Sequence, residues 1–407
     1  MHKQVRLRVW AATRRIGQVA MALSLSVGML VAVSACGGSF VPTWSPTLAP
    51  APSHTVDAAP PDSPYWSDTP RGNTIGNQIN SQQGTQLAVA DPSGGGFLGT
   101  LWGIQRISPS GDVLPNLLRS YGGSSLNLKD GRLYFIFGHS DDPGIGGVSR
   151  GIASMKTDGS NLTVLWSGES VSLQVIGGLI YFSCVFEEDG SPGDGDLNNG
   201  YVSRLCQMNQ DGTGWRVIQD HFSWSGWTVL GDYIYTQFRR DIKEFGLFRF
   251  PLSCPSDAPA YEVVLSGVTD VNGFDLTRDG AYVGTDSGLV HVSYDGTRRE
   301  QLTSGTGVES PLVIGDYVYF VLRIDDNFGD FSGGPIARVP LSGGEMTVIA
   351  PDVHDFSTGA LVNGWFYGPT GADWCAGDYY GRVRLDGSDL QSLASVLKGA
   401  VKPDIRC

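Results

Sequence analysis

Residues Gly315 to Ile349, GDYVYFVLRIDDNFGDFSGGPIARVPLSGGEMTVI, contain nearly a full copy of the unit from which most of the chain is built. Aromatic and β-branched residues are typical of strands, and Gly and Ser clusters are typical of the turns between them. The segment predicts strands over 317–320, 336–339 and 347–349, an acidic loop between the first two, and a hairpin turn at 342–344. Residues 309–314 supply a fourth strand. One unit is therefore predicted to be a four-stranded antiparallel meander.

This unit recurs along the chain. Its opening element returns as GRLYF, GLIYF, GDYIY, GAYVG and GWFYG, beginning at Gly131, Gly178, Gly231, Gly280 and Gly364, with a weaker copy, GTQLAV, at Gly84. Its hairpin turn returns at Ser110-Gly111, Asp158-Gly159, Asp211-Gly212, Asp295-Gly296 and Asp386-Gly387, with Cys254-Pro255 in its place in the fourth copy. Seven units are recognised, and a period of roughly 40 to 50 residues indicates a propeller or a solenoid.

The composition indicates an all-β protein. The chain holds 56 Gly and 22 Pro, only 17% of its residues are charged, and no stretch shows helical periodicity. A ring of sheets buries both faces of every blade and leaves only short edges. We therefore predict a β-propeller of four-stranded antiparallel blades, seven in number, with six as the alternative. An open solenoid is disfavoured because the repeats show no distinct polar caps.

The segment NTIGNQIN from Asn73 to Asn80, followed by repeats of the form G-D-x-I-Y and φ-x-R-φ-x-x-D-G, resembles a family of bacterial surface β-propellers. That family is related to the low-density-lipoprotein-receptor propeller and has no known function. The resemblance covers most of residues 73–395 and concerns the fold. The YWTD tetrad of the receptor propellers is absent, and the third repeat carries insertions, so no receptor-type ligand site is carried over.

The resemblance implies that the first strand of each blade lines a central channel. These strands are expected near 75–79, 125–128, 171–175, 227–230, 271–276, 310–314 and 358–362. The tyrosines that recur in the second strand are expected to pack between blades and not to form a binding stripe: Tyr134, Tyr181, Tyr235, Tyr319 and Tyr367. The Asp-Gly pairs are expected to serve turns, because Gly tolerates positive φ and Asp bonds to its own backbone.

The N-terminal residues predict export. Residues 1–35 carry five basic side chains and then an apolar run from Val19 to Val33, and the run ends in Val33-Ser34-Ala35-Cys36. This pattern is typical of a bacterial lipoprotein signal, in which Cys36 becomes the lipidated first residue. A plain signal peptide or a membrane anchor is the alternative reading. The Pro-rich segment 36–72 is predicted to be a semi-rigid tether, and residues 73–407 the propeller.

Differences between the repeats point to one face of the disc. The loops between second and third strands carry most of the charge: Asp141, Asp142, Glu187, Glu188, Asp189, Asp194, Asp196, Asp325, Asp326, Asp330, Asp373 and Asp378. The connections between blades fall on the same face and bring Tyr121, Trp166, His221, Phe222, Trp224, Trp227 and His354. Exposed aromatics recognise a sugar ring, a peptide or a cation, and the alternative is that they fill gaps between blades. This face is therefore the predicted binding surface.

The acidic loop of the third repeat suggests a calcium site. Asp194 and Asp196 alternate as the first oxygen ligands of an EF-hand loop do. However, Asn199 stands where that loop needs glycine, and Leu205 stands where it needs a bidentate glutamate. An irregular calcium site at these two aspartates is one hypothesis, and a solvated acidic loop is the other. No other cofactor is predicted.

Catalytic motifs are weak. The sequence has no GxSxG elbow, no HExxH motif and no zinc-spaced Cys/His cluster. His291 lies in a strand pattern and is predicted to be structural, whereas His139 has acidic neighbours at Asp141 and Asp142. A single His-Asp pairing is a weak sign of catalysis. No catalytic residue is therefore assigned.

The cysteines favour an oxidising compartment. Cys184 and Cys206 flank the long acidic insertion on strands expected to pair, so a bridge between them is predicted. A second bridge is predicted to tie Cys407 to Cys375, which leaves Cys254 unpaired.

These observations lead to one functional hypothesis. Loss of the signal would move the formal charge from −13 to −18, and an acidic body repels nucleic acid. We expect a monomeric binding or scaffolding module in the cell envelope, facing the periplasm or the exterior, with a lipid anchor and a protein or glycan partner. The rivals are a hydrolase or lyase of envelope or extracellular polymers, with His139 at the funnel, and an assembly factor for envelope complexes.

Overall fold

The described residues fall between Ala88 and Leu393. The computed structural model describes residues 88–91, 94–100, 103–118, 123–138, 150–176, 178–186, 202–219, 226–230, 232–239, 245–252, 261–277, 279–325, 331–332, 334–350, 360–362, 364–369 and 380–393. Contacts divide the chain into Met1–Ser45 and Pro46–Cys407, and every described residue belongs to the second unit. Among these residues, no helix has the length and apolar character needed to cross a membrane. The predicted signal, the tether and the strand expected near 75–79 lie outside them.

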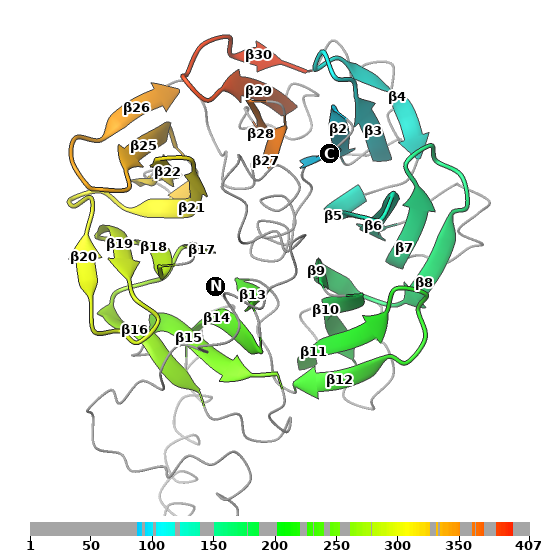
Figure 1. The fold of residues 1–407 in the computed structure, drawn as a ribbon, viewed down its shortest axis with the longest axis horizontal. Helices are drawn as coiled ribbons and strands as arrows, with labels where there is room; N and C mark the ends of the chain where they lie inside the picture. Colours follow the sequence, from blue (N-terminus) through cyan, green and yellow to red (C-terminus); the bar gives the residue numbers. More distant parts are fainter. Residues whose placement is uncertain are drawn as a thin grey trace, which may run out of the picture. The chain divides into compact units, whose positions relative to one another are not determined.

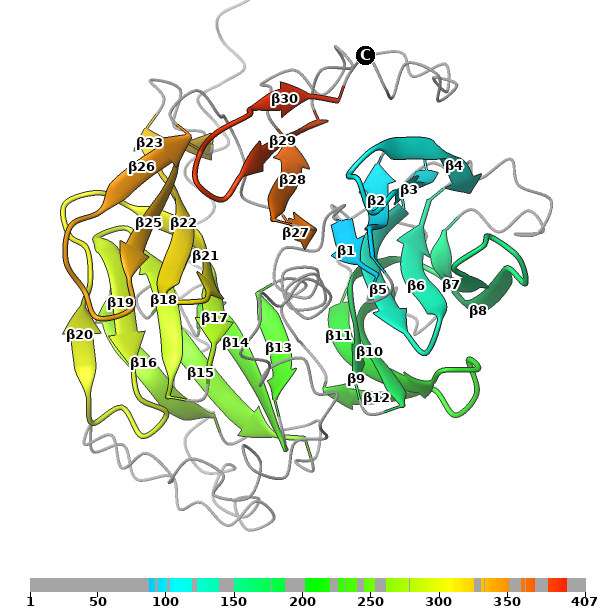
Figure 2. The same cartoon turned by 45° about the horizontal axis from the view of Figure 1, so that its top comes forward.

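Seven four-stranded antiparallel sheets form a ring, so the predicted seven-bladed β-propeller is confirmed (Figure 1). Blade 1 consists of β1 (Ala88–Ala90), β2 (Gly96–Thr100), β3 (Gly103–Ile107) and β4 (Val113–Leu118), and blade 2 consists of β5 (Gly123–Lys129), β6 (Arg132–Phe137), β7 (Gly151–Lys156) and β8 (Thr163–Ser167). Blade 3 consists of β9 (Ser170–Ile176), β10 (Leu179–Phe186), β11 (Val202–Asn209) and β12 (Arg216–Gln219). Blade 4 consists of β13 (Trp227–Leu230), β14 (Tyr233–Arg239), β15 (Phe245–Pro251) and β16 (Glu262–Val268). The first strand of each blade is innermost, as the resemblance implied (Figure 1 and Figure 2).

Blades 5 to 7 follow the same order, with one addition in blade 6. Blade 5 consists of β17 (Phe274–Leu276), β18 (Ala281–Thr285), β19 (Gly288–Val292) and β20 (Arg299–Gln301). Blade 6 consists of β21 (Val308–Ile314), β22 (Tyr317–Leu322), β25 (Ile336–Pro340) and β26 (Thr347–Ala350). Blade 7 consists of β27 (Ala360–Val362), β28 (Trp365–Pro369), β29 (Tyr380–Arg384) and β30 (Gln391–Ser392). A separate hairpin, β23 (Ile324–Asp325) and β24 (Phe331–Ser332), is inserted between β22 and β25.

In blade 1, the order of the strands differs by one from the sequence prediction. The segment from Gly84 was matched to the second strand of a blade, but Ala88–Ala90 is the first strand and pairs only with β2. The true second strand, Gly96–Thr100, is glycine-rich, and Leu98 stands where the other blades have tyrosine. A strand with so few β-forming residues reads as a loop, which explains the error.

The apolar core is distributed between neighbouring blades, as predicted. One cluster joins Phe97 of blade 1 to Phe135 of blade 2, and another joins Tyr235 of blade 4 to Val283 of blade 5. The largest cluster spans blades 6, 7 and 1 and includes Tyr319, Trp365 and Leu98. Each blade therefore depends on its neighbours for burial.

Buried polar side chains on the inner strands tie several blades together. Asn127 Oδ1 accepts a hydrogen bond from the Val175 amide at 3.1 Å, and Asp275 Oδ2 accepts one from the Val313 amide at 2.7 Å. Gln174 Oε1 likewise accepts a bond from the Val229 amide at 2.8 Å. Each bond crosses from one blade to the next, and such charged or amide acceptors satisfy buried amides that would otherwise be costly.

The recurring tyrosines pack between blades, as predicted. All five are almost completely buried. Tyr134 donates to Gln210 Oε1 of blade 3 at 3.3 Å, the Tyr235 ring lies 5.4 Å from Tyr294 of blade 5, and the Tyr319 ring lies 6.2 Å from Phe366 of blade 7. Burial raises the pKa of Tyr235 to about 12, so its hydroxyl stays protonated and available as a donor.

The Asp-Gly pairs form turns that bond to their own backbone. Asp211 Oδ1 accepts from both the Thr213 hydroxyl at 2.6 Å and the Thr213 amide at 2.9 Å. Asp158 and Asp386 accept in the same way from the serines two residues later. Hydrogen bonds from these hydroxyl and amide groups lower the pKa of all three aspartates. These residues therefore have a structural role.

His291 is a structural residue, as predicted. It lies in β19, is only 7% exposed, and stacks on Tyr282 with ring centroids 4.4 Å apart. Its Nε2 atom is buried without a hydrogen-bond partner among the described residues. Burial, reinforced by the charge of Arg298, lowers the pKa of His291, whereas Glu300 and Asp279 act in the opposite direction. The folded protein thus favours the neutral ring.

We predict that His291 makes the protein less stable in mild acid. As the pH falls through about 6.5, the unfolded histidine gains a proton before the folded one does, so the free energy of unfolding decreases. His291→Phe keeps the stack on Tyr282 and removes the titration, and its unfolding free energy should fall less between pH 7 and pH 5 than that of the wild type. Denaturant titrations at several pH values measure this difference. Parallel pH profiles for the two proteins would contradict the prediction.

Candidate interaction face

The meander of each blade separates the connections onto two faces. We call one the loop face; it carries the links between second and third strands and the links between blades. The other, which we call the turn face, carries the remaining turns, such as 130–131, 231–232, 315–316, 210–215 and 341–346. Turn-face segments have similar lengths in most blades, whereas the loops between second and third strands range from 286–287 in blade 5 to 187–201 in blade 3. Variation is therefore concentrated on the loop face.

Arg323 joins blades 5 and 6 on the loop face through two ion pairs. It follows β22 at the base of the β23–β24 hairpin and is 7% exposed. Its guanidinium bonds to Asp286 of blade 5, and its Nε lies 3.0 Å from Glu309 Oε1 of blade 6. Asn272 Nδ2 donates to Asp286 Oδ1 at 3.0 Å. A planar guanidinium suits two carboxylates at once, so this cluster fixes the hairpin base to both blades.

We predict that Arg323→Met lowers the free energy of unfolding by about 1–3 kcal/mol, because it leaves Glu309 and Asp286 without their shared cation. Glu309 is only 17% exposed, so solvent compensates it incompletely. Arg106→Met is the matched control, because Arg106 is exposed on β3. The control should change stability by about 0.5 kcal/mol or less in the same denaturant titration. Equal effects of the two substitutions would exclude a special role for Arg323.

A disulfide fixes the base of the long acidic loop. Cys184 of β10 and Cys206 of β11 are bonded, with their Cα atoms 6.0 Å apart, so the predicted bridge is confirmed. The register pairs Cys184 with Arg204 and Phe182 with Cys206, so the cysteines are diagonal neighbours across the two strands. Nearby, Arg150 Nη1 lies 2.5 Å from Glu169 Oε2 and ties blade 2 to the connection that enters blade 3. Residues 187–201 therefore leave from a rigid base.

Trp227 is buried between blades and does not belong to the predicted binding surface. It was placed among rim aromatics that either recognise a ligand or fill gaps between blades, and the structure shows the second role. Its side chain is 0% exposed, and its Nε1 donates to Ser172 Oγ of blade 3 at 2.7 Å. As the first residue of β13 it lies at the end of an inner strand, where the neighbouring blade covers it. It cannot contact a ligand without disrupting that packing.

Most of the other predicted site residues lie outside the described residues. These are Cys36, His139, Asp141, Asp142, Glu187, Glu188, Asp194, Asp196, His221, Trp224, Asp326, His354, Cys375 and Cys407. Asp325 is placed at the level of the backbone, on β23 opposite Phe331. Within the described ranges, no group of three or more His, Cys, Asp or Glu side chains is arranged to hold a metal ion. Asp325 is therefore the predicted binding residue that the structure places on the loop face.

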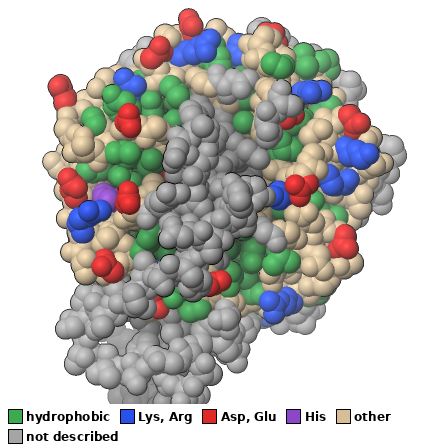
Figure 3. Space-filling view, in the orientation of Figure 1, with side chains coloured by type: hydrophobic (Ala, Val, Ile, Leu, Met, Phe, Trp, Pro, Cys, Tyr) green, Lys and Arg blue, Asp and Glu red, His purple; other side chains and the backbone are tan. Residues whose placement is uncertain are grey.

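Sequence reasoning missed the Arg323 cluster. Arg323 is the first residue after the second strand of blade 6, two residues before Asp325, and Asp286 occupies the matching position after the second strand of blade 5. Two opposite charges at equivalent positions of successive repeats were the available signal. In the view of Figure 3, acidic and basic side chains are interspersed around the rim of the described part, and neither sign forms a continuous patch.

Comparison with known proteins extends only to the fold. No family model matches this chain, and no curated protein matches it. Solved structures do match. A chain of a nidogen/laminin complex has 12% identity and a TM-score of 0.37, over 60% of this chain and 89% of that one. A gluconolactonase from Xanthomonas campestris has 15% identity and a TM-score of 0.39, over 58% and 81%.

A third similar structure is a puromycin-hydrolyzing peptidase from Mycobacterium tuberculosis. It has 10% identity and a TM-score of 0.48, over 82% of this chain and 56% of that one. Similarity at this level assigns no function to this chain.

Proposed function

We propose that this chain is an exported, lipid-anchored, monomeric propeller that binds an envelope protein or a glycan through its loop face and has no catalytic role. The observation that carries the proposal is the contrast between the faces. The strand bounds leave only two residues between first and second strands in five of the seven blades, whereas the loop-face segments differ in length from blade to blade. A rigid scaffold that presents variable loops is the usual design of a binding surface.

The chemistry of the loops supports a partner that is neutral or cationic. The loop-face sequences are acidic and include Trp224, and the described cluster there sets two carboxylates against the single guanidinium of Arg323. Aromatic rings beside carboxylates suit a sugar, a peptide or a cationic group. The anchor rests on Cys36 and the signal pattern before it. Cys36→Ala should move the protein out of the membrane fraction, and unchanged fractionation would remove the anchor from the proposal.

The test of binding is a pull-down from detergent-solubilised envelope with residues 37–407 as bait. The loop variant is Trp224→Ala/Asp325→Asn/Asp326→Asn. The control is Asp316→Asn/Glu345→Gln, which neutralises two exposed carboxylates on the turn face of the same blade. We expect the wild type and the control to retain the same partner and the loop variant to lose it. If the loop variant retains it, the proposed face is wrong, and an activity screen with His139→Ala becomes the next step.

A further inference from the structure

The ring closes without a shared sheet. Each of the seven four-stranded sheets is built from strands of one repeat, so blade 1 (β1–β4) and blade 7 (β27–β30) have no strand in common among the described residues. Backbone pairing therefore does not join the two ends of the propeller in this part of the chain. Side chains must hold the seam between these blades.

The inner-strand side chains that reach from one blade to the next differ between boundaries. Asn127 and Asp275, which reach from one blade to the next, stand opposite Tyr134 and Tyr282. The same register position is Ala360 in blade 7, opposite Tyr367, and it is also apolar in blade 6, where Leu312 is opposite Tyr319. Among the described residues, the seam is therefore one of the boundaries at which this position offers no amide or carboxylate acceptor.

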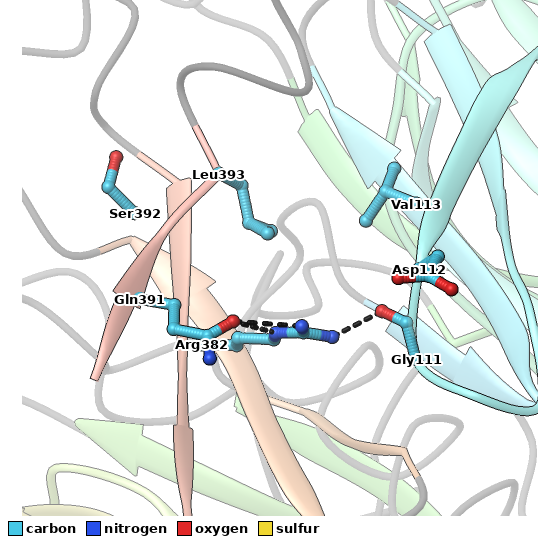
Figure 4. Close-up of a pocket in the computed structure, with 7 residues that line it drawn as sticks. All are labelled: Gly111, Asp112, Val113, Arg382, Gln391, Ser392 and Leu393. Carbon is cyan, nitrogen blue, oxygen red and sulfur yellow. Dashed lines mark hydrogen bonds between the residues drawn. The ribbon is translucent and has the colours of Figure 1, made fainter. Parts of the chain in front are cut away.

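Arg382 and Tyr367 supply polar bonds across the seam. Arg382 of β29 donates from Nη1 to the Gly111 carbonyl of blade 1 (Figure 4). Its Nε and Nη2 donate to Gln391 Oε1 at 3.0 and 2.8 Å, and its guanidinium lies 4.2 Å from the centre of the Trp365 ring. Tyr367 also donates to the Gly111 carbonyl, at 3.3 Å. Two side chains of blade 7 thus converge on one carbonyl of blade 1.

The backbone conformation of Gly111 and its lack of a side chain allow this contact. It has a φ of 90°, and a Cβ atom there would lie 2.8 Å from Arg382 Nη1. Any other residue would be strained in this conformation and would push the guanidinium away. The turn of blade 1 and the arginine of blade 7 are therefore matched to each other.

The equivalent arginine of blade 6 shows that the cross-blade bond is not a general property of the repeat. Arg338 of β25 stacks over Tyr317 at 4.5 Å and donates to Tyr319 Oη at 3.4 Å, as Arg382 does with Trp365 and Tyr367. Both of these contacts stay inside blade 6. Arg338 is therefore a natural control for Arg382.

The outer end of the seam carries an open pocket. It has a volume of about 500 Å³ and lies beside the Arg382 side chain, with Val113 of blade 1 and Leu393 of blade 7 on opposite sides of it (Figure 4). Val113 and Leu393 therefore do not close the seam at this end. The apolar cluster that joins Leu98 to Trp365 carries the rest of the closure.

We propose that the seam between blades 7 and 1 is a latch, held by Arg382, and that the ring opens there before any other blade boundary. Opening breaks the bond to Gly111, separates Val113 from Leu393 and enlarges the pocket between them. The other blades stay joined because the chain runs directly from each one to the next, whereas blades 7 and 1 are not consecutive in the chain. This conformational property belongs to the scaffold and is independent of what the loop face binds.

Native-state hydrogen–deuterium exchange of the full mature chain tests the latch. In the wild type, amides of β1–β3 and β28–β29 should exchange through a local opening that leaves β9–β15 protected. Arg382→Met should accelerate exchange at the seam by about tenfold, as expected for the loss of one charge-assisted hydrogen bond, and should leave β9–β15 nearly unchanged. Arg338→Met should not accelerate exchange at the seam.

Two outcomes would overturn the proposal. One is a wild type in which the seam amides are as protected as those of β9–β15, so that they exchange only when the whole protein unfolds. The other is an equal effect of Arg382→Met and Arg338→Met on all blades. If Arg382→Met fails to fold, Arg382→Lys takes its place, because lysine keeps one donor for Gly111. The comparison of the seam amides with those of β9–β15 in the wild type also tests the proposal without any variant.

Discussion

Replacement of Trp227 by alanine is expected to lower the free energy of unfolding by about 3–5 kcal/mol, the range for truncating a large buried aromatic side chain. The side chain is fully buried in a core that also contains Tyr181 of blade 3. The substitution would open a cavity between two blades and would remove the donor to Ser172 Oγ. Both losses act on the same blade boundary, so their effects combine.

Denaturant titration of three variants separates the contributions. Trp227→Phe keeps most of the ring and loses the indole N–H, so it should cost about 1–2 kcal/mol. Trp215→Ala is the control, because Trp215 is 50% exposed on the turn face and should cost about 1 kcal/mol or less. A Trp227→Ala protein as stable as the control would mean that Trp227 is not the packing residue described here, and would return it to the binding surface.

Removal of the disulfide has the second largest expected effect. Cys184 and Cys206 are separated by 22 residues in sequence, and closing a loop of this size stabilises a fold by about 3 kcal/mol in the chain-entropy account. The double variant Cys184→Ala/Cys206→Ala should lose about this much, because alanine leaves no unpaired polar group in the buried site. The loop it releases contains Glu187, Glu188, Asp194 and Asp196.

The same disulfide has a consequence for production and location. Both cysteines are 0% exposed, so a reductant should not reach the bond until the protein unfolds. We expect wild-type protein treated with dithiothreitol alone to match the untreated protein, and the protein treated in denaturant to match the double variant. A double variant with the wild-type denaturation midpoint would show that the bridge does not stabilise the fold. Protein made in a reducing cytoplasm should resemble the double variant.

Much of the fold follows from the sequence, because its signals are local and repeated. Strand-forming residues, a turn at a fixed offset and a tyrosine in the second strand recur in five of the blades, and neighbouring copies reinforce one another. Blade 1 lacked these signals. Its second strand has glycines at 96 and 99, and Gly99 lies so close to the Gly123 carbonyl of blade 2 that no side chain fits. Glycine is required at position 99 because of a contact with another blade, and the local sequence does not reveal that contact.

The candidate site was less predictable for the same reason. The contacts of Arg323 come from Asp286 and Glu309, which belong to different blades and carry no motif. Trp227 shows the opposite difficulty, since an aromatic residue next to a blade connection has the same sequence signature whether it faces solvent or a neighbouring blade. Only its burial and its bond to Ser172 distinguish the two cases. Local patterns predict elements, whereas contacts between blades decide which side chains remain available for binding.

The most direct test of the proposed loop-face binding is site-specific photo-crosslinking in cells. One probe replaces Ser287, which is exposed on the loop face between β18 and β19, and the other replaces Ser342, which is exposed on the turn face between β25 and β26. We predict a discrete crosslinked species from position 287 that disappears when Trp224→Ala/Asp325→Asn/Asp326→Asn is added, and none from position 342. The same crosslinks from both positions, or a species from position 342 alone, would contradict the account.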